Sequence, residues 1–236
     1  MANEQHARTV ALIGDKALGQ LAHARVAVFG IGGVGGHLAE ALARAGVGAL
    51  DLIDGDVVSV SNINRQMIAL HSTVGRPKVD VMAERIHDIN PDCTVCTYKR
   101  MYLPENADEL DLSVYDYIAD AIDTVSAKIE LSVRAKRLNI PIIAAMGAGN
   151  KLDPAAFEVA DLAKTTVCPL ARTMRLELRK RGINHLKVVY SKELPATSGV
   201  TDADGVRRVL PASISFVPGA MGLIMAGEII KDLIVK

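Results

Sequence analysis

Aromatic residues are scarce in this chain, which has no Trp, three Phe and five Tyr among 236 residues. Half of the residues are nevertheless hydrophobic, so a substantial core has to be built mainly from Ala, Val, Ile and Leu. Aliphatic side chains of this kind suit a parallel sheet that helices bury on both faces. The composition therefore favours an α/β protein.

The chain also lacks a net charge, since it has 27 basic and 27 acidic residues. Its total charge gives no indication of nucleic-acid or membrane binding, so any RNA contact needs a local basic patch. Three cysteines are few for this length, and residues 1–20 are polar and mixed rather than a secretory signal. We therefore expect a reduced, cytoplasmic protein.

A long hydrophobic run is missing too. Residues 216–235 are apolar but contain Glu228, Lys231 and Asp232, which leaves no uninterrupted stretch long enough to span a bilayer. This segment is predicted to be a helix packed on the sheet, and no membrane contact is expected.

Short apolar runs alternate with amphipathic stretches through the first 150 residues, a pattern typical of βαβ units and a parallel sheet. Strands are predicted at 25–30, 49–53, 95–98, 115–122 and 141–146, and helices at 33–45, 78–89 and 126–138. The order then loosens, with strands at 159–162 and 186–190 and helices at 170–181 and 219–234. We expect one domain over residues 1–236, a Rossmann-like, mostly parallel sheet with helices on both faces and a less regular C-terminal third.

A glycine-rich loop joins the first strand to the first helix of this pattern and contains Gly30, Gly32, Gly33 and Gly35. Glycines there let the main chain approach a phosphate, and the helix N-terminus offers unpaired N–H groups. Asp54 follows the next strand, where a ribose-binding carboxylate belongs. The motif predicts nucleotide binding without separating ATP from NAD, and a tight turn is its structural alternative.

Cationic residues between the second strand and the next helix favour a nucleoside triphosphate. Arg65 and Lys78 can pair with β- and γ-phosphates, whereas a dehydrogenase needs no such pair. Asp123 follows a later strand on the same sheet edge and suits Mg²⁺, which takes one or two carboxylates plus phosphates. Each has an alternative: Arg65 as a surface ion-pair partner, Lys78 as a solvated lysine and Asp123 as a helix cap.

These motifs together resemble a family of adenylyltransferases that includes the activators of sulfur-carrier proteins and the ubiquitin-activating enzymes. The shared pattern is a Gly-x-Gly-Gly-x-Gly loop, an acidic residue after the second strand, Asn-x-Asn-Arg-Gln, a Lys and Asp-x-x-Asp. The resemblance implies that ATP and Mg²⁺ are bound. It assigns the ribose to Asp54, phosphates to Arg65, Gln66 and Lys78, the metal to Asp123, and nucleotide binding also to Asn62 and Asn64. Arg8 matches an arginine that this family donates across a homodimer interface.

One branch of the family, the tRNA threonylcarbamoyladenosine dehydratases, is similar over nearly the whole chain. Segments 50–54, 79–86, 119–123 and 160–165 carry this similarity, which is close for residues 8–182 and looser afterwards. It implies a ligase-type reaction in which a carboxylate on tRNA is adenylated and then cyclised with loss of water. A sulfur-relay partner protein is a further implication. The alternatives are an activator of a ubiquitin-like sulfur carrier ending in Gly-Gly, and a Rossmann protein binding NAD.

Three cysteines and one basic helix remain to be placed. Cys93 and Cys96 form a lone Cys-x-x-Cys with too few partners for zinc, and the late Cys pairs of many carrier activators are missing. Cys168, where the resembled branch often has Asp, is a helix-cap residue or a nucleophile. The predicted helix at 170–181 is either a solvated basic face or an RNA contact, and Lys187 would extend it. The polar segment 197–208 is long enough to close over a substrate.

Overall fold

The computed structural model describes residues 4–196 and 212–235, and its centre is a seven-stranded sheet. The strand order is β3-β2-β1-β4-β5-β7-β6, and every pairing is parallel except that of the edge strand β6 with β7. This is the predicted Rossmann-like sheet. The strands are β1 (Arg25–Phe29), β2 (Ala49–Ile53), β3 (Thr94–Tyr98), β4 (Tyr117–Asp120), β5 (Ile142–Ala145), β6 (Phe157–Asp161) and β7 (Lys187–Ser191).

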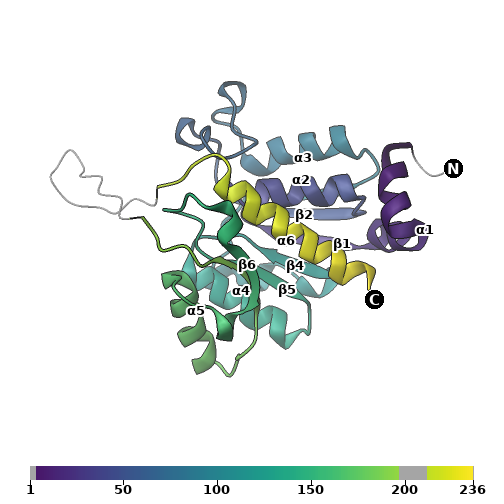
Figure 1. Ribbon diagram of the computed structural model, residues 1–236. Coiled ribbons are helices and arrows are strands. Elements are labelled where there is room, and N and C mark those ends of the chain that lie inside the picture. The colour runs from purple at the N-terminus through teal and green to yellow at the C-terminus, as the bar shows by residue number, and fades with distance from the viewer. Residues whose placement is uncertain (1–3, 197–211, 236) are drawn as a thin grey trace.

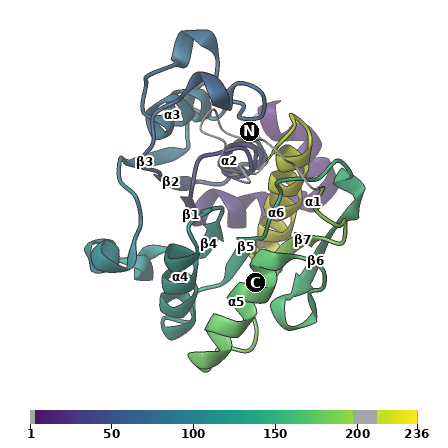
Figure 2. The same ribbon diagram turned by 90° about the vertical axis from the view of Figure 1, so that its left-hand side faces the viewer.

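Helices cover both faces of the sheet (Figure 1). One face carries α2 (Gly35–Ala45), α3 (Lys78–Ile89) and α6 (Val217–Ile234), and the other carries α4 (Val125–Arg137) and α5 (Pro169–Lys180). Figure 2, turned by 90° from Figure 1, shows α4 and α5 on the opposite side of the strands from α2 and α6. The remaining long helix, α1 (Ala7–His23), packs at the end of the sheet against α6 and α2.

Alternation along the strands explains why both faces are apolar. In β1, Val26 and Val28 pack in the core under α2 and α6, whereas Ala27 and Phe29 pack in the core under α4. All four side chains are fully buried. The C-terminal apolar segment is helix α6, and the first of these cores contains its buried side chains Val217, Met221, Met225, Ala226, Ile229 and Leu233. No helix in the described part of the chain is long and apolar enough to cross a membrane.

Predicted and observed boundaries agree best where the periodicity is strong. The strand at 49–53 and the helix at 78–89 were predicted with the observed ends. The strand expected at 115–122 is shorter, because Tyr115 and Asp116 precede it and the chain turns after Asp120. Helix α1 was not predicted. Gly14 interrupts its pattern with a φ of 82°, which kinks the helix.

The strand order reverses between β1 and β4, since β2 and β3 lie on one side of β1 while β4 and β5 lie on the other. The carboxyl ends of β1, β2, β4 and β5 meet at the same edge of the sheet. Open α/β sheets bind their ligands in the crevice at such a reversal. The fold therefore brings the glycine loop, Asp54 and the segment after Asp120 to one place.

A buried polar cluster stabilises the opposite half of the central strands. The carboxylate of Asp51, 1% exposed, accepts hydrogen bonds from Arg25 Nε at 3.0 Å and Nη2 at 2.9 Å, from Tyr98 Oη at 3.1 Å and from Tyr115 Oη at 2.9 Å. Burial and the adjacent Asp51 carboxylate raise the pKa of Tyr115, so this hydroxyl stays protonated and donates.

Replacing Asp51 by Ala is expected to lower the free energy of unfolding by about 3 kcal/mol or more, because buried donors lose their acceptor. The matched control is Tyr98→Phe, which removes one of the hydrogen bonds and is expected to cost about 1 kcal/mol. Urea unfolding followed by circular dichroism measures both. A loss below the control's value for Asp51→Ala would contradict the assignment.

Candidate active site

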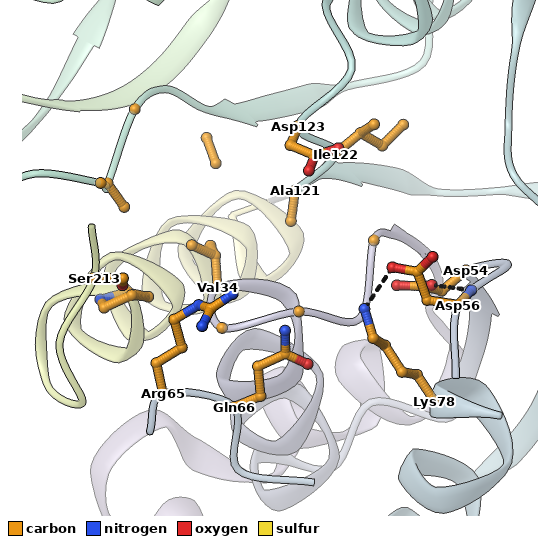
Figure 3. Close-up of a pocket in the computed structure, with 18 of the residues that line it drawn as sticks. Val34, Asp54, Asp56, Arg65, Gln66, Lys78, Ala121, Ile122, Asp123 and Ser213 are labelled. Atoms are coloured by element: carbon orange, nitrogen blue, oxygen red, sulfur yellow. Dashed lines mark hydrogen bonds and ion pairs between the residues drawn. The ribbon is translucent and has the colours of Figure 1, made fainter. Parts of the chain in front are cut away.

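A cavity of about 570 Å³ lies at this edge of the sheet. The glycine loop forms its floor, and the segments after β2, β3, β4 and β5 form its walls. Ser213 and Pro218, at the entry to α6, close one side. Figure 3 shows Arg65, Gln66 and Lys78 approaching from one side of the glycine loop and Asp123 lying on the other.

The glycine loop has its shape because two of its members cannot carry a side chain. Gly30 has a φ of 87°, and a Cβ there would lie 2.7 Å from the carbonyl oxygen of Ala121. A Cβ on Gly35 would lie 1.8 Å from the carbonyl oxygen of Gly30. The N–H groups of Gly32, Gly33 and Val34 donate to no acceptor among the residues that the structure describes. Three free donors before a helix N-terminus make an anion site.

Asp54 is held rigidly at the end of β2. Its Oδ2 accepts the N–H of Ile31 at 2.6 Å and its Oδ1 accepts the N–H of Asp56 at 2.8 Å. Burial raises the pKa of Asp54, while Lys78 and these two N–H groups oppose that shift. The carboxylate thus lines the cavity in a fixed orientation, with lone pairs left for hydroxyl donors.

Lys78 begins α3 and is buried, with 5% of its surface exposed, so it is not a solvated lysine. Its Nζ lies 2.7 Å from Oδ2 of Asp56, whose side chain is 57% exposed. The main chain reinforces this arrangement, because the N–H of Lys78 donates to the carbonyl of Asp56 at 3.0 Å. A buried ammonium with one exposed carboxylate partner is placed to exchange that partner for a phosphate.

Arg65 and Gln66 follow a short 3₁₀ turn, η2 (Val60–Asn62), and its last residue, Asn62, holds their main chain by hydrogen bonds. The carbonyl of Asn62 accepts the N–H groups of both, at 3.0 and 2.9 Å. Nη1 of Arg65 donates to Oδ1 of Asn64 and to the carbonyl of Ser61, each at 2.9 Å. In the described residues Arg65 forms no ion pair, so its charge is uncompensated at the cavity.

Not every predicted residue lines the cavity. Gly30, Gly32, Gly33, Asp54, Arg65, Gln66, Lys78 and Asp123 do, whereas Gly35, Asn62, Asn64 and Arg8 do not. Asn62 and Asn64 lie behind it, where Asn62 Oδ1 accepts the N–H of Ser59 and Asn64 Nδ2 donates to the carbonyl of Ser213. Arg8 is exposed on α1, which Figure 1 places beside the far end of α6 from the cavity.

Sequence reasoning missed the wall after β3. Arg100, Met101 and Tyr102 line the cavity and cross over Gly55, where a Cβ would lie 2.7 Å from the N of Met101. Their position directly after a parallel strand was the available signal. Asp56 was also missed as the partner of Lys78. The segment 197–208, which we considered for closure over a substrate, lies outside the described residues.

The chain's cysteines do not form a metal site. Cys93 packs in the core beneath α2 and α3, whereas Cys96 lies on the other face of β3, with its Sγ 3.6 Å from Arg25 Nη2. Within residues 4–196 and 212–235, no three His, Cys, Asp or Glu side chains are grouped to hold a metal. Cys168 is the residue before α5, 4% exposed, and its side chain makes no capping hydrogen bond.

The α5 face is only partly free to bind a ligand. Nη1 of Arg175 donates to the carbonyls of Leu162 and Thr165, and Lys180 and Arg181 pair with Glu177. Arg172 and Arg179 are exposed, and neither pairs with an acidic group in the described residues. Lys187 does not extend the patch, because Glu228 and Asp232 bind its ammonium at 3.0 and 2.9 Å.

Comparison with known proteins places this arrangement in a family. The ThiF family model matches residues 4–236. The chain belongs to the ThiF family. A tRNA threonylcarbamoyladenosine dehydratase from Bacillus subtilis is 43% identical over 240 residues, which cover 98% of this ThiF-family chain and 94% of the relative.

Two further relatives bear on its chemistry. The crystal structure of E. coli tRNA N6-threonylcarbamoyladenosine dehydratase, TcdA, in complex with ATP matches with a TM-score of 0.89 and 38% identity, covering 98% of this ThiF-family chain and 94% of that one. The adenylyltransferase and sulfurtransferase uba4 of Aspergillus clavatus is 34% identical over 90% of this chain but only 40% of its own length.

The cysteine geometry predicts unequal reactivity toward a thiol reagent such as dithionitrobenzoate. Burial raises the pKa of Cys93 to about 11, and Cys168 is almost inaccessible. At pH 8 we expect only the half-buried Cys96 to react within minutes, because the thiolate is the nucleophile. Cys96→Ser should abolish this fast phase. A fast phase that survives that change and disappears in Cys168→Ser would mark Cys168 as reactive and contradict its buried placement.

Proposed function

We propose that this ThiF-family chain is an ATP-dependent tRNA threonylcarbamoyladenosine dehydratase that adenylates the threonylcarbamoyl carboxylate. The observation that carries the proposal is one cavity joining two cations, an exposed carboxylate and glycine-loop N–H groups that have no acceptor in the described part of the chain. NAD has a diphosphate but no terminal γ-phosphate, so an NAD enzyme would have less phosphate charge for Arg65 and Lys78 to neutralise. The relatives that share almost the full length and carry this name support the substrate.

The phosphates of ATP would lie over the glycine loop. The N–H groups of Gly32, Gly33 and Val34 would donate to phosphate oxygens, and the guanidinium of Arg65 would add a second set of donors. Lys78 would leave Asp56 for the departing pyrophosphate. Asp54 would accept hydrogen bonds from the ribose hydroxyls, with Arg100, Met101 and Tyr102 enclosing the nucleoside side.

The proposed reaction has two steps. A carboxylate oxygen of the substrate forms a bond to the α-phosphorus, and the bond from that phosphorus to the β-phosphate oxygen breaks, releasing pyrophosphate. A nitrogen of the substrate then bonds to the acyl carbon, AMP leaves with the former carboxylate oxygen, and the nitrogen loses a proton. The chain's own task is to align the reactants and to neutralise charge on the phosphates, so no protein nucleophile is required.

Asp123 fits a magnesium ion by its chemistry. It is exposed at the cavity, and among the described residues its only hydrogen bond is from Thr124 Oγ1 at 3.4 Å and no Lys or Arg pairs with it. In nucleotide sites the protein usually contributes one or two carboxylates to Mg²⁺, and the nucleotide contributes phosphate oxygens. The ion would supply charge neutralisation at the triphosphate when bound.

The wider proposal includes a homodimer, RNA contacts, a cytoplasmic location and one adenylating domain over residues 1–236. Helix α6 has 18 residues, about 27 Å at the usual rise, and separates α1 from the cavity of its own chain. Arg8 would therefore serve the partner's ATP. Arg172 and Arg179 would contact tRNA phosphates beside the cavity, where Leu170 of the same helix is a wall residue. A sulfur-relay protein is the remaining proposed partner.

The second candidate is a carrier-protein activator, which the similarity to uba4 favours. It shares the adenylation step and differs in the carboxylate that is activated. ATP consumption to AMP and pyrophosphate, measured with tRNA bearing threonylcarbamoyladenosine and separately with a Gly-Gly-ending carrier, decides between them. We expect turnover with the modified tRNA and none with the carrier. Turnover with the carrier alone would move the substrate to a protein.

Replacing Asp123 by Ala is expected to reduce Mg²⁺-dependent turnover with the modified tRNA by about 100-fold or more, since charge on the triphosphate is then poorly neutralised. Asp92→Ala is the matched control, because Asp92 is an exposed aspartate that lies outside the cavity lining. Pyrophosphate release over a range of Mg²⁺ concentrations measures the effect. Unchanged turnover and Mg²⁺ dependence in Asp123→Ala would rule out a metal role.

The proposed action of Arg8 across a dimer can be tested by mixing two inactive variants. Arg8→Ala and Lys78→Ala should each lose adenylation while remaining folded dimers. After subunit exchange, half of the dimers hold one chain of each kind, and one of their two sites is intact. Mixing should therefore restore about a quarter of wild-type turnover. No recovery, with mixed dimers demonstrated by mass spectrometry, would contradict the assignment.

A further inference from the structure

Two main-chain segments of the cavity touch at a place where neither can shift alone. The segment 121–123 follows β4, and its Ala121 carbonyl oxygen would lie 2.7 Å from a Cβ on Gly30. A Cβ on Gly35 would meet the Cβ of Ala121 at 3.3 Å. A displacement of Ala121 therefore displaces the glycine loop as well. The position of Asp123 and the position of the phosphate-facing N–H groups are coupled through this contact.

A buried ion pair lies directly behind this segment. Asp120 and Lys128 are both 0% exposed, and Lys128 Nζ lies 3.0 Å from Asp120 Oδ1. The same ammonium donates to the carbonyl of Ile122 at 3.2 Å, and the N–H of Ile122 donates to Asp120 Oδ1 at 3.2 Å. Neither charged side chain lines the cavity. The pair thus fixes the main chain on both sides of Ala121.

Stability alone does not explain two buried charges at this position. Apolar residues of similar volume are often as stabilising as a buried ion pair, because the pair's attraction is offset by the loss of hydration. What an apolar pair does not provide is a donor to the Ile122 carbonyl and an acceptor for the Ile122 N–H. Those two hydrogen bonds determine the direction in which the chain leaves β4 toward Asp123.

We propose that Lys128, acting with Asp120, is a positioning residue for adenylation. It holds the segment 121–123 against Gly30, so that Asp123 and the glycine loop are aligned on the triphosphate. The inference rests on the proposed function, because it concerns the same site. Lys128 contacts neither ATP nor the acyl substrate in this account.

The test compares the single variants Lys128→Met and Lys128→Gln with the double variant Asp120→Asn/Lys128→Met. Lys128→Met leaves a buried carboxylate unpaired and should lower the melting temperature by about 6–12 °C. The double variant removes both charges and should recover most of that loss. Lys136→Met is the matched control, since Lys136 is exposed on the same helix.

Activity should follow the donor to Ile122 rather than stability. We expect kcat to fall about 10- to 100-fold in both Lys128→Met and the double variant, with KM for ATP changed less than about 3-fold. Lys128→Gln, whose amide can still donate, should retain more activity than Lys128→Met. Lys136→Met should match the wild type. If kcat instead follows melting temperature and returns in the double variant, the pair is only structural and the inference is wrong.

Hydrogen exchange of the Ile122 amide separates this inference from the proposed function. The acceptor of this N–H is Asp120 Oδ1, and an asparagine at this position keeps an acceptor oxygen, so exchange reports on how firmly the segment 121–123 is held. Without any substrate present, protection should decrease in Lys128→Met and the double variant, where the Ile122 carbonyl has lost its donor, and be kept in Lys136→Met. Retained protection in the double variant would contradict the positioning role. Wild-type protein that shows this protection but no turnover with modified tRNA would contradict the proposed function instead.

Discussion

The site depends on a contact between two main-chain segments, in which Gly30 lies against the carbonyl of Ala121 with no room for a side chain. This contact joins the loop after β1 to the loop after β4 at the point where the strand order of the sheet reverses. One loop presents N–H groups that have no acceptor within residues 4–196 and 212–235, and the other presents Asp123. Because the backbones touch, the distance between a phosphate cradle and a carboxylate is determined by the fold rather than by flexible side chains.

Charges are distributed around this contact in two layers. Inside the cavity, Arg65 has no acidic partner in the described residues and Lys78 has one that is largely exposed, so a triphosphate meets cations that are available. Behind the cavity, Asp120 and Lys128 neutralise each other completely out of water. The charges inside the cavity are suited to binding a ligand, and the buried pair behind it is suited to fixing the main chain. Such a division lets a site carry charge for its ligand without loosening the frame that positions it.

Much of this could be read from the sequence, because the relevant signals are local. The glycine loop, Asp54 and Asp123 each follow a buried strand, and parallel strands bring such positions together. Helix α3 was predicted with its observed ends because its apolar positions recur with helical spacing. The kinked helix α1 escaped notice, since Gly14 breaks that spacing and Leu12 is 86% exposed.

Other features depend on tertiary contacts that no local pattern encodes. Asn62 and Asn64 belong to the recognised motif, yet they lie behind Arg65 and Gln66 rather than at the cavity. Asp56 becomes meaningful only once Lys78 is seen to be buried against it. Lys128 looks like an ordinary helix lysine in the sequence, and only the packing of α4 under β4 shows that it has no access to water.

The central claim is that the substrate's carboxylate oxygen attacks the α-phosphorus of ATP in this cavity. It is tested most directly with tRNA whose threonylcarbamoyl carboxylate is labelled with ¹⁸O, by mass spectrometry of the products after turnover. The account predicts that the label appears in AMP. Label in inorganic phosphate or in water, with none in AMP, would contradict adenylation and with it the role given to the site.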